Sequence, residues 1–139
     1  MIYSFEKIHG TIGQSEILYQ LLQQREYNIS HSAIPTFKTH YEFVKNHPYR
    51  DWFLVKENNN YIGSLYLKYD NSIGLNLGEV NCNLLKTCVD FIKLNFKPAA
   101  PQPSMIPPYF YINVAATNEK LKSTANAVKL RPLQLSFKI

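Results

Sequence analysis

The segment from His47 to Leu77 constrains the fold more than any other part of the chain. Three apolar, β-prone runs lie in it, at about residues 51–56, 61–69 and 72–78. Asn58-Asn59-Asn60 and Asp70-Asn71 separate these runs, and Asn and Asp form turns because they tolerate left-handed backbone conformations. The pattern predicts an antiparallel three-stranded meander. Because the strands are apolar on both faces, we expect helices to cover both sides of the sheet.

Helical and extended patterns alternate on either side of the meander. Thr36 is a natural N-cap for one helix, and His47-Pro48 ends it because the residue before proline is disfavoured in a helix. The other expected elements are a strand at 2–5, a helix at 14–24, a helix from Asn81 or Asn83 to about Phe96, a strand at 109–114, a helix from Thr117 or Asn118 to about Lys129, and a final strand at 133–139. In that last segment Leu133, Leu135, Phe137 and Ile139 alternate with polar residues, which predicts a half-buried antiparallel strand.

The order of these elements predicts an α/β (α+β) fold, with a central mixed, mostly antiparallel sheet and helices on both faces. At 139 residues and 45% hydrophobic composition, we expect one domain over residues 1–139. No apolar stretch reaches the roughly 20 residues that span a bilayer, and the first residues lack the order of a signal peptide. We therefore expect a cytoplasmic protein without a membrane partner.

Charge and residue usage narrow the function classes. The net charge of +5 suits an anionic partner, but the basic residues are scattered and the tyrosines lie in regular elements, so we do not expect nucleic acid binding. Cys82 and Cys88 point in different directions on one predicted helix, which favours reduced structural thiols. Five prolines between Pro98 and Pro108 predict a stiff, extended surface loop, and a proline-rich ligand for a partner is the alternative.

Three histidines invite a metal hypothesis, but their spacing argues against it. His40 and His47 are seven residues apart, too far for the adjacent ligands of an i, i+4 pair, so we expect local structural roles and no metal. Arg50 could recognise an anion, or it could be a structural arginine packed on an aromatic ring or paired with a carboxylate.

The order of elements and several short motifs together resemble the GNAT superfamily, the Gcn5-related N-acetyltransferases. The motifs are Ile29-Ser30-His31, Pro35-Thr36, His40, His47-Pro48-Tyr49-Arg50, Trp52, Ile62-Gly63-Ser64, Tyr66-Leu67 and Ile73-Gly74. They cover about the first 78 residues, and the rest of the chain matches by element order only. The resemblance implies a strand that parts from its neighbour so that its free backbone pairs with the pantetheine arm of acetyl-CoA.

The same resemblance implies a set of site residues. Backbone at Leu75, Asn76, Leu77 and Gly78 would hold acetyl-CoA, with Asn113 and Asn118 helping. His31, in the loop between the first two helices, would line the acceptor site. For Asn113 there is an equally supported alternative to a role at the cofactor: it could be a polar residue at a strand end that forms hydrogen bonds with its own loop.

Two motifs of the family are altered here. Gly78-Glu79-Val80-Asn81-Cys82-Asn83 stands in place of a glycine-rich loop whose backbone N–H groups would wrap the pyrophosphate, and it contributes a carboxylate. In the fourth helix, Ala125 stands where a tyrosine would protonate the leaving thiolate. Catalytic residues therefore stay unassigned.

These observations lead to two expectations for function. The first is a divergent N-acetyltransferase of weak or lost activity that transfers acetyl from acetyl-CoA to a small-molecule or peptide amine. The second is a non-catalytic binding or assembly module that keeps the GNAT-like scaffold and no longer binds acetyl-CoA. Association into a homodimer is compatible with either.

Overall fold

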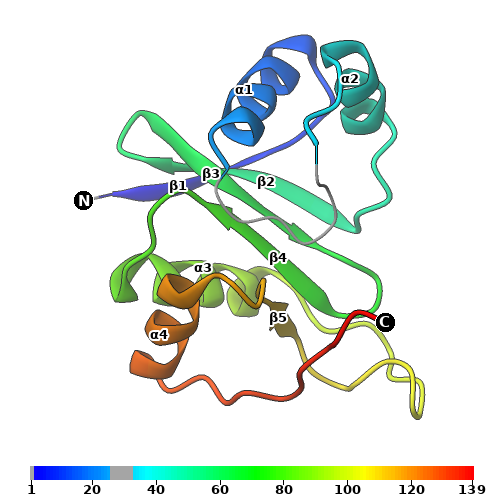
Figure 1. Cartoon of the computed structure of the whole chain (residues 1–139), viewed down its shortest axis with the longest axis vertical. Helices are drawn as coiled ribbons and strands as arrows, with labels where there is room; N and C mark the ends of the chain where they lie inside the picture. The colour runs from blue at the N-terminus through cyan, green and yellow to red at the C-terminus, as the bar shows by residue number, and fades with distance from the viewer. Residues whose placement is uncertain (1, 26–32) are drawn as a thin grey trace.

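The computed structural model describes residues 2–25 and 33–139, which form a mixed α+β structure (Figure 1). In this part of the chain, four helices accompany a five-stranded, mostly antiparallel sheet. The elements are β1 (Tyr3–Lys7), α1 (Ile12–Gln23), α2 (Phe37–Lys45), β2 (Asp51–Glu57), β3 (Asn60–Leu67), β4 (Ser72–Leu77), α3 (Cys82–Asn95), β5 (Tyr111–Asn113) and α4 (Glu119–Ala127).

The strands lie in the sheet in the same order as in the sequence, β1-β2-β3-β4-β5. The first four pair antiparallel, and β5 pairs parallel with β4 after the crossover through α3. The meander predicted for β2, β3 and β4 is confirmed. Its turns use Asn58 at φ 55° and Asn71 at φ 70°, the left-handed conformation that asparagine tolerates.

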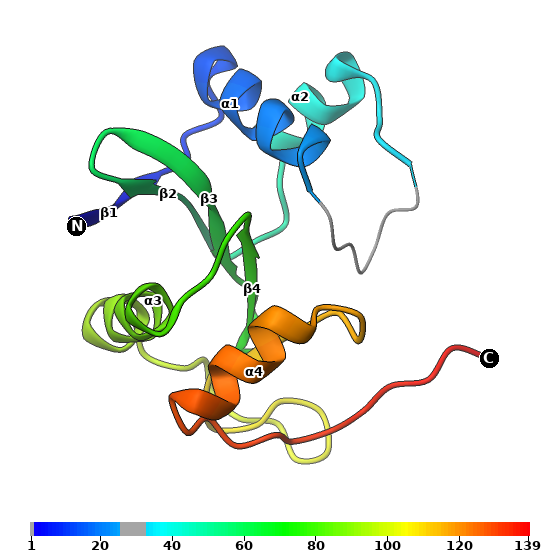
Figure 2. The same ribbon diagram turned by 60° about the vertical axis from the view of Figure 1, so that its left-hand side comes forward.

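Helices cover both faces of the sheet, as the apolar strands predict. Figures 1 and 2 show α1 and α2 on one side and α3 and α4 on the other. Strand alternation divides β2 between the two sides: Trp52 and Leu54 pack with the α1 and α2 residues Leu18 and Val44. Neighbouring β2 residues face the other core, which also contains Leu65, Leu67, Leu75, Leu84, Leu85, Cys88, Ile92 and Leu121.

Each helix begins at a polar cap. Thr36 Oγ1 accepts a hydrogen bond from the Thr39 N–H at 3.3 Å, which confirms the predicted start of α2. Of the alternatives that the sequence offers, Asn81 caps α3 and Asn118 caps α4. α1 begins two residues earlier than predicted, because Thr11 accepts from the Gln14 N–H and becomes the cap. None of the described helices is long and apolar enough to cross a membrane.

The proline-rich segment between α3 and β5 is a loop, as predicted, but it is not extended throughout, because Gln102 and Ile106 form an antiparallel bridge around a turn. Asn71 fixes both ends of this loop. This residue is fully buried at the β3–β4 turn. Its Nδ2 donates to the carbonyls of Ala99 and Pro107, and its Oδ1 accepts from the Ala99 N–H. The Tyr111 N–H donates to the Asn71 carbonyl at 3.1 Å, so the same residue also begins the pairing of β5.

Two predictions near the end of the chain are wrong. β5 covers three residues, Tyr111–Asn113, rather than the six of 109–114. Residues 133–139 form no strand, and Leu135 and Phe137 are 82% and 84% exposed. The alternation identifies the face that a strand would bury, but a strand also needs a neighbouring edge, and no described strand of the chain lies beside these residues.

Candidate functional site

The main irregularity of the sheet is the short contact between β4 and β5. The two strands pair only from Ser72 with Tyr111 to Gly74 with Asn113. β4 continues for three more residues, Leu75–Leu77, which pair with β3 on the opposite side. The β4 edge that faces away from β3 therefore has no strand partner at Leu75–Leu77 in the described structure. Such an edge offers backbone N–H and C=O groups to an extended ligand.

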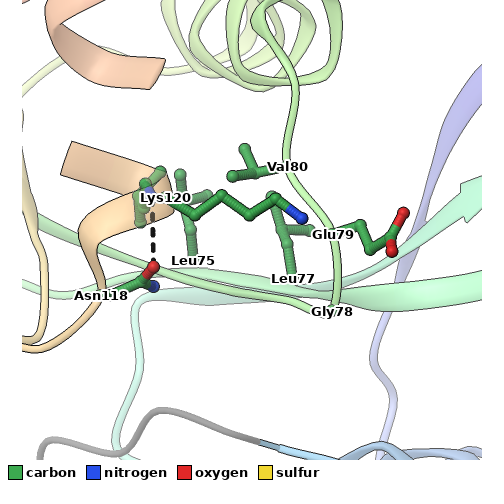
Figure 3. A pocket seen from close by; sticks show the side chains of 8 residues that line it. Leu75, Leu77, Gly78, Glu79, Val80, Asn118 and Lys120 are labelled. Atoms are coloured by element: carbon green, nitrogen blue, oxygen red, sulfur yellow. Dashed lines mark hydrogen bonds between the residues drawn. The ribbon is translucent and has the colours of Figure 1, made fainter. Parts of the chain in front are cut away.

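A pocket of about 120 Å³ lies against this open edge (Figure 3). Three segments form it: Leu75 and Leu77 from β4; Gly78, Glu79 and Val80 from the link to α3; and Asn118, Lys120 and Leu121 around the start of α4. The sequence-derived cofactor residues Leu75, Leu77, Gly78 and Asn118 are thus brought together in one place.

Asn76 and Asn113 do not line this pocket. Asn76 lies between Leu75 and Leu77 in β4, so strand alternation sends its side chain to the α1 and α2 side of the sheet. Asn113 ends β5 opposite Gly74 and is exposed. Both residues lie next to the point where β4 and β5 part, one on the open edge and one at the end of the pairing.

The charged side chains at the pocket are Glu79 and Lys120. In Figure 3 the Lys120 side chain extends across the pocket in the direction of Leu77 and Glu79. Both residues are exposed. Sequence reasoning noticed the carboxylate and missed the amine. The sequence position of Lys120 could have identified it, because a lysine in the first turn of α4 opposes the usual preference for acidic residues at helix N-termini.

Asn118 has a structural task at the pocket wall. Its Oδ1 accepts a hydrogen bond from the Leu121 N–H at 3.1 Å, which caps α4 (Figure 3). Asn81 does the same for α3, accepting from the Leu84 N–H at 2.8 Å. The β4–α3 link is therefore only Gly78-Glu79-Val80 before the cap, and its glycine does not have a positive φ.

The buried polar side chain in the middle of α4 is Thr124, and its hydroxyl already donates a hydrogen bond to the Lys120 carbonyl at 2.8 Å. Leu121 is buried, and Ala125 packs against the same apolar cluster. The helix ends at a left-handed residue, Lys129 with φ 64°, after which the Leu130 N–H donates to the Ala125 carbonyl. The position that the sequence analysis examined for a general acid is thus a packing position.

Other residues that the sequence analysis singled out lie away from this pocket. Arg50 Nη1 donates to the Lys97 carbonyl at 2.8 Å and its guanidinium lies 5.7 Å from the Phe96 ring centroid, so Arg50 is a structural arginine. His47 Nδ1 accepts from the Tyr49 N–H at 3.2 Å, and burial lowers the pKa of this imidazole. His40 is buried beside Tyr19. His31 lies outside the described residues.

The opposite side of β4 carries an aromatic pair that sequence reasoning did not connect. The rings of Tyr49 and Tyr66 stack with centroids 4.0 Å apart, and Tyr66 lies over Gly74, where any Cβ would overlap its ring. Burial raises the pKa of Tyr49 to about 12. The pair fills the space beside β4 on the α1 and α2 side.

Comparison with models of known protein families finds no match, and comparison with curated proteins finds none either.

Proposed function

We propose that this chain is a GNAT-like protein that holds the pantetheine arm of acetyl-CoA along β4 and transfers the acetyl group to an amine. The observation that carries the proposal is the open edge of Leu75–Leu77 beside a pocket formed by β4 and the start of α4. The pantetheine arm contains two amide groups in an extended chain. It can therefore add to a sheet edge as a peptide strand does.

The transfer is a direct displacement. The nitrogen lone pair of the neutral amine attacks the thioester carbonyl, the C–N bond forms and the C–S bond breaks. The nitrogen loses a proton, and the departing thiolate gains one. In this proposal water carries both protons, because Ala125 offers none. A positioned general acid typically contributes about 10²–10⁴-fold, so we expect turnover slower by about that factor than in an enzyme that has one.

The phosphate end of the cofactor would meet mixed charge. Lys120 attracts the pyrophosphate and Glu79 repels it, and the Gly78-Glu79-Val80 link lacks a glycine-rich cradle. Each charge-assisted hydrogen bond is worth about 1.5–3 kcal/mol, so a site without several of them binds acetyl-CoA weakly.

Glu79 and the short link also favour a second candidate, a non-catalytic binding module built on the same scaffold. A carboxylate at the pocket opposes any polyanionic cofactor, and retention of the open edge then serves a different extended ligand, such as a peptide strand. The two candidates differ in one property, the binding of acetyl-CoA.

Titration calorimetry with acetyl-CoA separates them. Under the first candidate, Glu79→Gln tightens binding about threefold and Lys120→Gln weakens it about threefold, since exposed charge interactions are worth less than about 1 kcal/mol. Lys93→Gln is the matched control, because Lys93 is an exposed lysine of α3 outside the pocket lining. Absence of heat with millimolar acetyl-CoA for the wild type and for Glu79→Gln would sink the enzyme proposal and leave the binding module.

Transfer itself is measured as release of free CoA thiol with a panel of small amines and lysine-containing peptides. Acetyl-CoA binding without thiol release above the uncatalysed rate would contradict the catalytic part of the proposal. The binding part would stand.

A further inference from the structure

Residues 133–139, the apolar arm, expose a regular row of large apolar side chains. Leu133, Leu135, Phe137 and Ile139 alternate with Gln134, Ser136 and Lys138, the period of a strand with one buried face. Yet Leu135, Phe137 and Ile139 are all more than 80% exposed. Monomeric proteins rarely leave such a continuous apolar row in water.

The base of the arm is fixed and the arm itself leaves the molecule. Leu130 packs against the core below the sheet, and its N–H donates to Ala125 at the end of α4. Pro132 follows, which stiffens the exit. In Figure 2 the arm (red) then runs past α4 and ends clear of the sheet.

The same chain carries a matching acceptor, the outer edge of β5. β5 is the last strand of the sheet, and among the described residues only β4 pairs with it. Because the Tyr111 N–H donates to Asn71 toward β4, the N–H of the next residue, Ile112, points to the open side. The segment before β5 exposes Met105 and Tyr109, so the approach to this edge is apolar.

We propose that two copies of this chain exchange their apolar arms, each arm adding a strand to the β5 edge of the other copy. The arm supplies the apolar face and the unpaired backbone, and the β5 edge supplies the complementary backbone and the apolar neighbours. In an exchange related by a two-fold axis, each arm pairs with the β5 edge of the other copy. The dimer is then closed, and no arm or edge is left to bind a third copy. The proposal is independent of acetyl-CoA binding.

Size-exclusion chromatography with light scattering tests the exchange. The wild type should have twice the chain mass of 16.1 kDa at micromolar concentration. Phe137→Asp should shift it to the single-chain mass, while Ser136→Asp, which places the same charge on the polar face of the arm, should leave the dimer intact. Both residues are exposed in the single chain, so neither change should alter its circular dichroism.

A single-chain mass for the wild type at all concentrations overturns the proposal, as does a dimer that Phe137→Asp leaves unchanged. The route of exchange is read from isotope-filtered NOEs in a mixture of labelled and unlabelled copies. Contacts between Phe137 of one copy and Tyr109 of the other are expected. A dimer in which the arm contacts only its own chain also overturns the exchange.

Discussion

Asn71 binds Ala99 through both ends of its side-chain amide. Its Nδ2 donates to the Ala99 carbonyl at 3.1 Å, and its Oδ1 accepts from the Ala99 N–H at 2.6 Å. A residue in a β-turn thereby fixes a loop that lies 28 positions further along the chain. The remaining bond, from Nδ2 to the Pro107 carbonyl at 2.9 Å, holds the far end of the same loop.

Asn71→Ala should therefore be one of the most damaging substitutions in the protein. It removes three side-chain hydrogen bonds from a fully buried site and places alanine at φ 70°. An unpaired buried polar group costs about 1–3 kcal/mol, and the left-handed backbone adds about 1–2 kcal/mol. We expect the free energy of unfolding, measured by urea denaturation, to fall by about 3–5 kcal/mol.

Asn58→Ala is the matched control, because Asn58 has φ 55° in an exposed turn and, within residues 2–25 and 33–139, its Oδ1 accepts only from the Ile2 N–H. This variant should lose about 1–2 kcal/mol, mainly from the backbone. Equal losses in the two variants would show that the loop does not depend on the Asn71 amide.

Gly63→Ala should destabilise the sheet through steric overlap with β4. A Cβ at residue 63 would meet the backbone carbonyl oxygen of Asn76 and lie 3.0 Å from the Leu77 Cα, and backbone cannot move aside as a side chain can. We expect a loss of at least about 2 kcal/mol in urea unfolding, within the range for overpacking.

Gly13→Ala provides the comparison of opposite sign. Gly13 lies in α1, and a Cβ there would meet nothing within 4 Å. Alanine should stabilise the protein by up to about 1 kcal/mol through helix propensity. A neutral result at Gly63 would mean that β3 and β4 pair less closely than described.

Stability should fall as the pH drops below about 6.5, and His40 should contribute to the fall. Burial lowers the pKa of His40 below its ordinary value of 6.5. The unfolded chain therefore binds a proton that the folded chain refuses. The contribution of His40 to the free energy of unfolding is complete above the pKa that this histidine has in the unfolded chain. It is lost as the pH falls from there through the lower pKa of the folded protein.

For one histidine, the free energy of unfolding changes by at most about 1.4 kcal/mol per pH unit. Urea unfolding at pH 7.5 and 5.5 should show a smaller difference for His40→Leu than for the wild type. His9→Gln is the control, since His9 is exposed. A wild-type pH dependence that His40→Leu leaves unaltered would assign the effect to other groups, among them His47, whose pKa burial also lowers.

The two cysteines should differ sharply in reactivity. Cys82 is exposed, whereas Cys88 is buried in the core and burial raises its pKa from 9.0 to about 12. The thiolate is the reactive form, so this pKa alone lowers the reactive fraction of Cys88 by about a thousandfold. In a titration with a disulfide reagent, one thiol per chain should react quickly and the second only after denaturation. Cys82→Ser should abolish the fast phase, and a fast phase that survives in this variant would place Cys88 at the surface.

Local patterns in the sequence predict the meander, the two-sided burial and the cap at Thr36, and they narrow the caps of α3 and α4 to two residues each, because each feature depends on neighbouring residues only. The same patterns fail at residues 133–139, where the alternation is present but the partner strand is not supplied by the described part of the chain. Asn71 illustrates the same limit. Its turn role can be read from sequence, whereas its contacts with Ala99 and Pro107 depend on the path of a distant loop.

In the candidate site, too, some residues can be predicted from the sequence and others depend on the three-dimensional structure. Leu75, Leu77, Gly78 and Asn118 come together because the end of β4 and the start of α4 border the same pocket. Lys120 was missed because its inclusion depends on how far a flexible side chain reaches across the pocket (Figure 3). Asn76 is predicted through its backbone, which lies on the open edge of β4, whereas alternation sends its side chain to the other face of the sheet.

The sequential order of the strands has a consequence for how the sheet can form. β1 to β4 are joined by antiparallel pairing, and β5 joins β4 at the outer edge through three residue pairs. No strand must be inserted between two others, so the sheet can grow outward from the β2–β3 hairpin. β5 has the fewest residue pairs, so it is the strand of this sheet that we expect to exchange its amide hydrogens with solvent first. The pocket beside β4 thus borders the strand of the sheet that we expect to open most readily.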